Sequence, residues 1–264
     1  WLGARSASGD YLLFTDGDVK LRPEMLRRAM NVMLENRLDH LTLYPDAGRG
    51  SFWETVLMSY FVLMFSAFTR AALARFRWAR RAAVGIGAFN LVKRSAYEAV
   101  GTHRRLRLEV ADDVMLGRVI KQAGFRQDAM LGKPLVFVRW QTGVGGIIRG
   151  LEKNAFAGTR YSLPMALLGI AFTLAVGVAL PILAVTGPGR VPLAIMAGSL
   201  TLTMLGVALE AGYNPLVALF WPMGAALFAF TIARSTYLTL RNGGITWRGT
   251  FYPLAMLKAG MTVA

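Results

Sequence analysis

Two aspartates one residue apart, Asp16 and Asp18, are the first residues whose type and spacing could carry chemistry. They follow Tyr11–Thr15, whose apolar, aromatic and β-branched residues predict a buried strand. Open α/β sheets bind ligands at the carboxyl ends of their strands, where two carboxylates could hold Mg²⁺ or Mn²⁺ together with a diphosphate. The intervening Asp-Gly step is also a strong hairpin signal, so the chain could instead turn back onto Val19–Leu21.

A second carboxylate pair, Asp112 and Asp113, lies in the first turn of a helix predicted over Glu109–Gly124. The helix dipole favours acidic residues at this position, which is a sufficient structural reason for both. A functional reason also exists, because a general base is a carboxylate held in a cleft against a substrate hydroxyl. Neighbouring residues of a helix point in different directions, so one base and one supporting residue is the expected division.

A third candidate is the pair Arg139-Trp140, which follows a short strand predicted at Leu135–Val138. An arginine can hold a diphosphate through two parallel hydrogen bonds, and a tryptophan can stack on a sugar or a base. The same pair before a membrane-proximal stretch would also serve as an anchor at the membrane interface.

The elements that would position these residues alternate between helix and strand. Pro23–Asn36 is predicted as a helix with its apolar residues on one face, and His40–Tyr44 as a strand. Val84–Val92 is glycine-punctuated and then strand-like, and Ser95–Val100 begins a short helix. This alternation predicts an α/β domain over residues 1–160.

The composition indicates a membrane protein. Hydrophobic residues make up 55% of the 264 residues, the formal net charge is +15, and there is no cysteine. The absence of cysteine excludes a disulfide framework and a thiolate metal site. A basic chain can bind nucleic acid, but no nucleic-acid motif accompanies the charge, and basic residues beside long apolar runs are typical of cytoplasmic flanks.

Three apolar segments of about 20 residues each, at about 163–186, 191–209 and 215–237, are long enough to cross a bilayer. A basic and aromatic tail, 241–264, follows them. Basic residues flank the three segments on both sides, which places both ends and the 1–160 domain in the cytoplasm. Three full crossings would separate the ends, so either one segment is re-entrant or the apolar run at 51–69 also takes part.

The run at 51–69 is nearly long enough to span a bilayer, but it contains Glu54 and many aromatic residues. Those features favour a helix lying at the membrane interface. Arginines interleaved with aromatic residues follow directly, from Arg70 to Arg81, as at an edge that contacts lipid headgroups. A core helix with a solvated basic end is the alternative.

The order of these signals resembles the membrane-bound family 2 glycosyltransferases, which have the GT-A nucleotide-diphospho-sugar transferase fold. Four segments carry the resemblance: ARSASGDYLLFTDGDV from Ala4, GIGAFNLVKRSAYEAVGTH from Gly85, EVADDVMLG from Glu109, and VRW followed by LEKNAFAG from Val138. In the same order, they are similar to four features of the family. These are the strand with the D-x-D motif, the G.F.L.RR.AYE.VGGH segment, the V.ED..LG helix, and the membrane-proximal segment of the lipid-directed branch. That branch includes ceramide glucosyltransferase-like and hopanoid- or carotenoid-associated members.

The resemblance implies a role for each carboxylate. Asp16 and Asp18 would bind a divalent cation, Mg²⁺ or Mn²⁺, that bridges the donor diphosphate. Asp113 would deprotonate the acceptor hydroxyl, and Asp112 would support it. The implied enzyme is an inverting glycosyltransferase that moves a sugar from a nucleotide-diphospho-sugar to a membrane lipid.

The resemblance also implies binding residues. Gly87 and Phe89 would line the donor or acceptor pocket, and Arg139 and Trp140 match the end of the family's (Q/R)-x-x-R-W motif. The first position of that motif is Val136 here, which disfavours a processive polysaccharide synthase and favours single transfer. The family's N-terminal strand and leading membrane helix are missing, so the chain is expected to be the C-terminal part of such an enzyme. The alternatives are a polysaccharide synthase, separable by product size, and a non-catalytic transporter or scaffold.

Overall fold

The computed structural model describes residues 1–262, which form two compact units. Unit 1 holds residues 1–48 and 66–140 together with the described residues from 260 onward, and unit 2 holds 49–65 and 141–259. The helix α3 (Phe52–Thr69) begins in unit 2 and ends in unit 1. Each unit has its own hydrophobic clusters and is described by itself.

Unit 1 is built on a four-stranded sheet with the strand order β1-β4-β3-β5. β4 pairs antiparallel with both β1 and β3, whereas β3 and β5 are parallel. A separate two-stranded ribbon joins β2 to β6. The strands are β1 (Tyr11–Phe14), β2 (Lys20–Leu21), β3 (His40–Tyr44), β4 (Asn90–Lys93), β5 (Gln127–Leu131) and β6 (Val136–Phe137).

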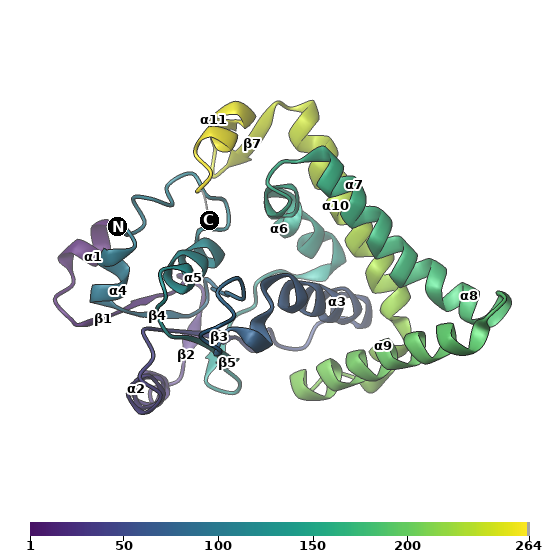
Figure 1. Cartoon of the computed structure of the whole chain (residues 1–264), viewed down its shortest axis with the longest axis horizontal. Coiled ribbons are helices and arrows are strands. Elements are labelled where there is room, and N and C mark those ends of the chain that lie inside the picture. The colour runs from purple at the N-terminus through teal and green to yellow at the C-terminus, as the bar shows by residue number, and fades with distance from the viewer. Residues whose placement is uncertain (263–264) are drawn as a thin grey trace. The chain divides into compact units, whose positions relative to one another are not determined.

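Helices cover both faces of this sheet, as Figure 1 shows for α2 on one side and α4 and α5 on the other. Alternation along β4 explains the two faces, because Leu91 packs in the cluster with α2 and Val92 in the cluster with α4 and α5. The helices are α1 (Leu2–Ser6), α2 (Met25–Glu35), the 3₁₀ turn η1 (Ala71–Leu73), α4 (Arg94–Ala99) and α5 (Asp112–Gln122). The mixed α/β architecture expected for this part of the chain is confirmed.

The hairpin alternative for Asp16-Gly17-Asp18 is wrong. β1 pairs with β4, with Leu13 opposite Leu91, and does not return onto 19–21. β2 instead pairs with β6, with Leu21 opposite Val136. The two aspartates therefore stand at the end of a sheet strand.

Most predicted elements of unit 1 are present with shifted ends. The helix expected over Glu109–Gly124 begins at Asp112, and the strand expected at Leu135–Val138 is the two-residue β6. β5 was not predicted, because Gln127–Leu131 shows no apolar alternation. Its first residue is a fully buried glutamine, which sequence patterns place at a surface.

Unit 2 is mainly helical. α7 continues through a π-helical turn, η2, into α8, and Pro181 stands in the first turn of α8. A proline removes a backbone donor and commonly accompanies such irregular turns. The elements are α6 (Gly143–Gly158), α7 (Leu163–Leu174), η2 (Ala175–Ala179), α8 (Leu180–Thr186), α9 (Arg190–Ala211), η3 (Pro215–Phe220), α10 (Trp221–Arg241), β7 (Gly244–Trp247), β8 (Thr250–Pro253) and α11 (Leu254–Ala259).

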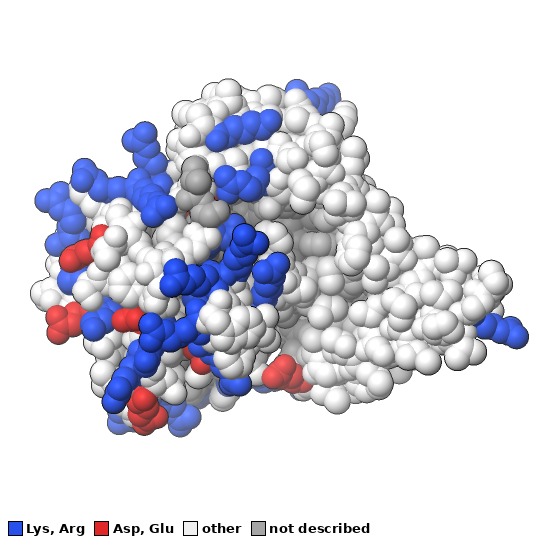
Figure 2. Space-filling view, viewed as in Figure 1, with Lys and Arg blue, Asp and Glu red and all other residues white. Residues whose placement is uncertain are grey.

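The helical part of the chain contains four helices, not three, that are long and apolar enough to cross a membrane within residues 1–262. Three match the predicted segments, at Leu163–Thr186, Arg190–Ala211 and Pro215–Arg241. The fourth is α3, Phe52–Thr69, which was expected to be interfacial. Figure 2 shows a broad surface over α8 and α9 that is uncharged except near the two ends of α9, where Arg190 and Glu210 lie, while most Lys and Arg gather elsewhere. This distribution supports membrane association.

The chain returns to unit 1 after its apolar helices. The Thr262 amide donates to Glu109 Oε1, and the Thr262 hydroxyl donates to the Arg105 carbonyl at 3.3 Å. If unit 1 lies on one face of a bilayer, the chain that leaves it can come back to the same face only after an even number of crossings. Three full crossings between residues 141 and 259 would not allow this return, which is the same conflict that the basic residues at both ends of the apolar region raise.

Candidate active site

The carboxyl end of β1 is fixed to the segment that precedes β4. The Asp16 amide donates to the Gly87 carbonyl at 3.0 Å, and the Thr15 hydroxyl donates to the Ala88 carbonyl at 2.9 Å. A turn follows, in which the Val19 amide donates to the Asp16 carbonyl at 3.3 Å. Asp16 and Asp18 are both exposed to solvent on this turn.

Asp113 reaches the same segment from α5. Its Oδ2 accepts from the Gly87 amide at 2.7 Å, and its Oδ1 accepts from its neighbour, the Val114 amide, at 2.8 Å. Burial raises the pKa of Asp113 to about 6, and the negative charges of Asp112 and Asp16 add to the rise. The two backbone hydrogen bonds act in the opposite direction. The result is a carboxylate that titrates close to neutrality.

The carboxylates of Asp16 and Asp113 both lie close to Gly87. A Cβ on Gly87 would lie 2.7 Å from Asp16 Oδ2 and 3.4 Å from Asp113 Oδ2. Carboxylates far apart in the sequence therefore face one backbone position, and a side chain there would displace at least one of them. The exposed Asp112 lies beside Asp113 in the first turn of α5.

Backbone contacts hold the glycine segment against α5. A Cβ on Gly85 would lie 1.9 Å from the Asp113 carbonyl oxygen, and a Cβ on Gly117 would lie 2.2 Å from the Val84 carbonyl oxygen. Only glycine permits such an approach at both places. This close packing fixes the distance between Gly87 and the start of α5.

A buried polar network that the sequence analysis missed supports the segment from behind. Gln127 accepts from the Val84 amide at 3.0 Å through Oε1, and its Nε2 donates to the Gly117 carbonyl at 2.9 Å. Gln127 Nε2 also lies 2.6 Å from His40 Nδ1, while His40 Nε2 lies 2.9 Å from Asn90 Oδ1. Burial lowers the pKa of His40 to about 4, so the ring is neutral, accepting at Nδ1 and donating at Nε2.

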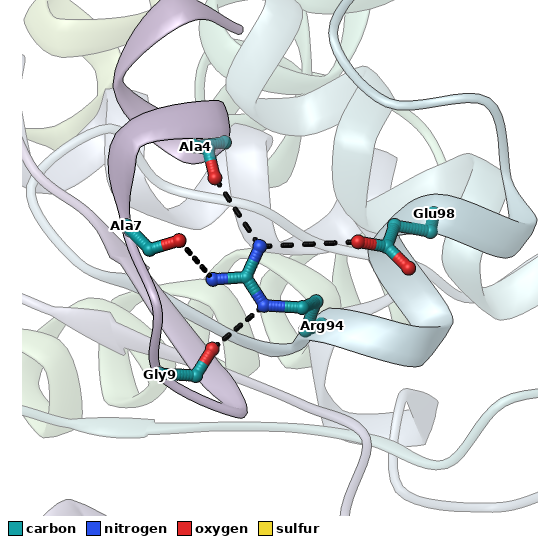
Figure 3. Close-up of polar contacts among 5 residues, drawn as sticks. All are labelled: Ala4, Ala7, Gly9, Arg94 and Glu98. Carbon is teal, nitrogen blue, oxygen red and sulfur yellow. Dashed lines mark hydrogen bonds and ion pairs between the residues drawn. The ribbon is translucent and has the colours of Figure 1, made fainter.

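The entrance to β1 is held by Arg94, at the start of α4 (Figure 3). Its guanidinium donates to the carbonyl groups of Ala4, Ala7 and Gly9 at 3.2, 2.8 and 2.7 Å, and Glu98 lies 3.8 Å away. The planar guanidinium suits three divergent acceptors, which an ammonium could not reach together. Arg94 thus ties the segment before β1 to α4.

The other predicted binding residues lie in different places. Phe89 is fully buried in the cluster with α2 and is not directed to the carboxylates. A turn explains why Gly87 and Phe89 diverge, since the Phe89 amide donates to the Ile86 carbonyl at 2.9 Å. Arg139 follows β6 and donates to the Ala47 carbonyl at 3.4 Å, with Trp140 next in the chain.

Within residues 1–262 no group of three or more His, Cys, Asp or Glu side chains is arranged to hold a metal ion. Mg²⁺, however, is commonly bound by one or two carboxylates and completed by substrate phosphates and water. The exposed oxygens of Asp16 and Asp18 are donors of the right chemistry for such a site. The donor chemistry of Asp16 and Asp18 therefore fits a divalent cation whose remaining ligands would be phosphate oxygens and water.

Comparison with known proteins identifies the family of the chain. A family model described as glycosyl transferase family 21 matches residues 2–257, nearly the whole chain. No curated protein and no solved structure matches the chain. The match excludes the non-catalytic transporter or scaffold considered above, and the chain belongs to glycosyl transferase family 21 and is a glycosyltransferase.

Proposed function

We propose that this enzyme transfers one sugar from a nucleotide-diphospho-sugar to a hydroxyl of a membrane lipid, with inversion at the anomeric carbon. The observation that carries the proposal is the convergence of Asp16 and Asp113 on Gly87. A general base for the attacking hydroxyl and a carboxylate that could hold a cation for the leaving diphosphate would together serve an in-line displacement.

Asp113 is proposed as the general base. Its pKa of about 6 leaves it ionised at neutral pH while keeping it basic enough to accept a proton from a hydroxyl. Its hydrogen bonds to the Gly87 and Val114 amides hold the carboxylate in a fixed orientation. Asp112 supports the base through its charge, which raises the pKa of Asp113.

Asp16 and Asp18 are proposed to hold Mg²⁺ or Mn²⁺. When bound, such an ion stabilises the negative charge of a departing nucleoside diphosphate. Arg139 and Trp140 remain expected donor-binding residues, the arginine for the diphosphate and the tryptophan for a sugar or base. Gly87 contributes by its lack of a side chain, which leaves room for the two carboxylates.

A membrane lipid is the proposed acceptor because the candidate membrane helices belong to the same chain as the carboxylates. A lipid hydroxyl lies at the bilayer surface, so the enzyme meets it without extracting the lipid. The basic flanks of the apolar helices favour a cytoplasmic location for unit 1. Val136 at the first position of the (Q/R)-x-x-R-W pattern supports single transfer.

The test uses the full-length protein in vesicles with a panel of radiolabelled nucleotide sugars and a membrane lipid extract. Asp113→Asn is expected to abolish transfer while donor binding persists, and Asp16→Asn to abolish metal-dependent donor binding. Asp10→Asn, which neutralises an exposed aspartate before β1, is the matched control and should leave both unchanged. Normal turnover by the Asp113→Asn variant would exclude Asp113 as the base.

A further inference from the structure

The segment that follows α3 carries a concentration of positive charge that the proposed reaction does not use. We call residues 70–83 the basic loop. No Asp or Glu occurs anywhere between residues 55 and 97. Figure 2 shows Lys and Arg far outnumbering Asp and Glu on the face in view. Five exposed arginines lie in the loop: Arg70, Arg75, Arg77, Arg80 and Arg81.

The basic loop also exposes aromatic side chains. Trp78 is 74% exposed, and its ring stacks on the ring of Phe76 at a centroid distance of 5.8 Å. The Arg75 guanidinium lies over the Phe76 ring, 5.0 Å from its centroid. A tryptophan held in water beside several arginines has a ready partner at a bilayer surface, where the ring meets the headgroup region and the arginines meet phosphates.

The loop is held in place from beneath by a buried lysine. The Lys121 ammonium, on α5, donates to the carbonyl groups of Ala74 and Phe76, the latter at 3.0 Å. Burial lowers the pKa of Lys121, and the two carbonyl groups accept from two of its three N–H donors. The Ala83 amide donates to the Thr69 carbonyl at 3.0 Å and closes the loop at its base. The exposed arginines are therefore presented on an ordered backbone, which lowers the entropy lost on binding.

We propose that the basic loop docks on anionic lipid headgroups and places Trp78 in the interfacial region of the bilayer. Two observations favour a bilayer over a soluble anion. The charge is complementary to an anionic leaflet, and the loop continues directly from α3, one of the candidate membrane helices. The proposal does not depend on the transferred sugar or on the roles of the aspartates.

The chain has no cysteine, so a single introduced cysteine can be labelled without background. Trp78→Cys labelled with nitrobenzoxadiazole is placed in nanodiscs of phosphatidylcholine alone or mixed with phosphatidylglycerol, using the full chain. The emission should shift to the blue and become quenchable from the acyl chains when phosphatidylglycerol is present, and salt should reverse part of the shift. The same label at Leu26→Cys, an exposed position on α2, should stay in water in both lipids.

Charge variants test which arginines act. Each arginine near an anionic surface strengthens docking by about fivefold. The double variant Arg80→Gln with Arg81→Gln should therefore lower the ratio of docked to undocked loop about 25-fold. The matched control, Arg27→Gln with Arg28→Gln on the exposed face of α2, removes the same charge and should change nothing.

Three outcomes would overturn the proposal. The label at position 78 stays in water in both lipids, the α2 variants weaken docking as much as the loop variants, or inorganic pyrophosphate shifts the label in discs of phosphatidylcholine alone. The last result would make the loop a site for a soluble anion.

Discussion

Asp113→Asn should change the pH dependence of stability as well as activity. The pKa of Asp113 is about 6 in the folded chain, against an ordinary value of 3.8. The folded state therefore holds this proton more tightly than the unfolded state. Stability falls as the pH rises through the window between those two values and stays lower above it. One pKa unit corresponds to about 1.4 kcal/mol, so the ionised carboxylate lowers the free energy of unfolding by about 3 kcal/mol at neutral pH.

The asparagine variant lacks this ionisation and serves as its own reference across pH. Its amide, like the protonated carboxyl group, can accept from only one of the Gly87 and Val114 amides through its oxygen. The melting temperatures of the wild type and the variant should therefore be most similar at about pH 4. At about pH 7.5 the difference, variant minus wild type, should be larger by about 5 to 10 °C.

The assay is thermal unfolding of both proteins in the same detergent over that pH range. Asp10→Asn, at an exposed site, should track the wild type at every pH. A melting-temperature difference that does not vary with pH would refute the argument that burial raises the pKa of Asp113. Transfer by the wild type should fall below about pH 6 as the base becomes protonated, measured as kcat/KM against pH.

Three further predictions test the support of the site. Gly87→Ala should lower transfer at least about tenfold because its methyl group would displace a carboxylate, whereas Gly17→Ala, with nothing within 4 Å of the added Cβ, should retain activity in the same assay. Gln127→Leu should destabilise unit 1 by about 2 to 4 kcal/mol, measured by denaturant unfolding, because buried donors and acceptors lose their partner; an unchanged midpoint would contradict this. Arg94→Lys should speed amide hydrogen exchange in the segment before β1, whereas Glu98→Gln should not; equal effects would show that charge alone acts.

The local signals in the sequence were sufficient for several elements. β1 and β3 are runs of strand-forming residues, and α5 has an acidic first turn. The hairpin alternative could not be settled locally, because the partner that β1 chooses, β4, begins at Asn90. Strand pairing over such a separation depends on the packing of α2, α4 and α5, which no short window contains.

The candidate site was predictable as a set of residue types but not as an arrangement. Nothing in the spacing of Asp16 and Asp113 shows that both face Gly87. The neutral His40 and the buried Gln127 were missed because polar residues in short strands are usually placed at a surface. The signal that could have found them is a polar residue beside apolar strand neighbours, as in the run His40–Tyr44.

The backbone of Gly87 couples the two carboxylate-bearing residues. Its carbonyl accepts from the Asp16 amide while its amide donates to the Asp113 carboxylate, so two consecutive peptide groups that share one Cα link the two residues. Asp113 owes its raised pKa first to burial, and then to negative charges that include that of Asp16. Neutralising Asp16 therefore makes Asp113 a stronger acid and readies it as a carboxylate. A cation bound at Asp16, as proposed, would therefore favour the ionised form of Asp113, which is the form that can accept a proton.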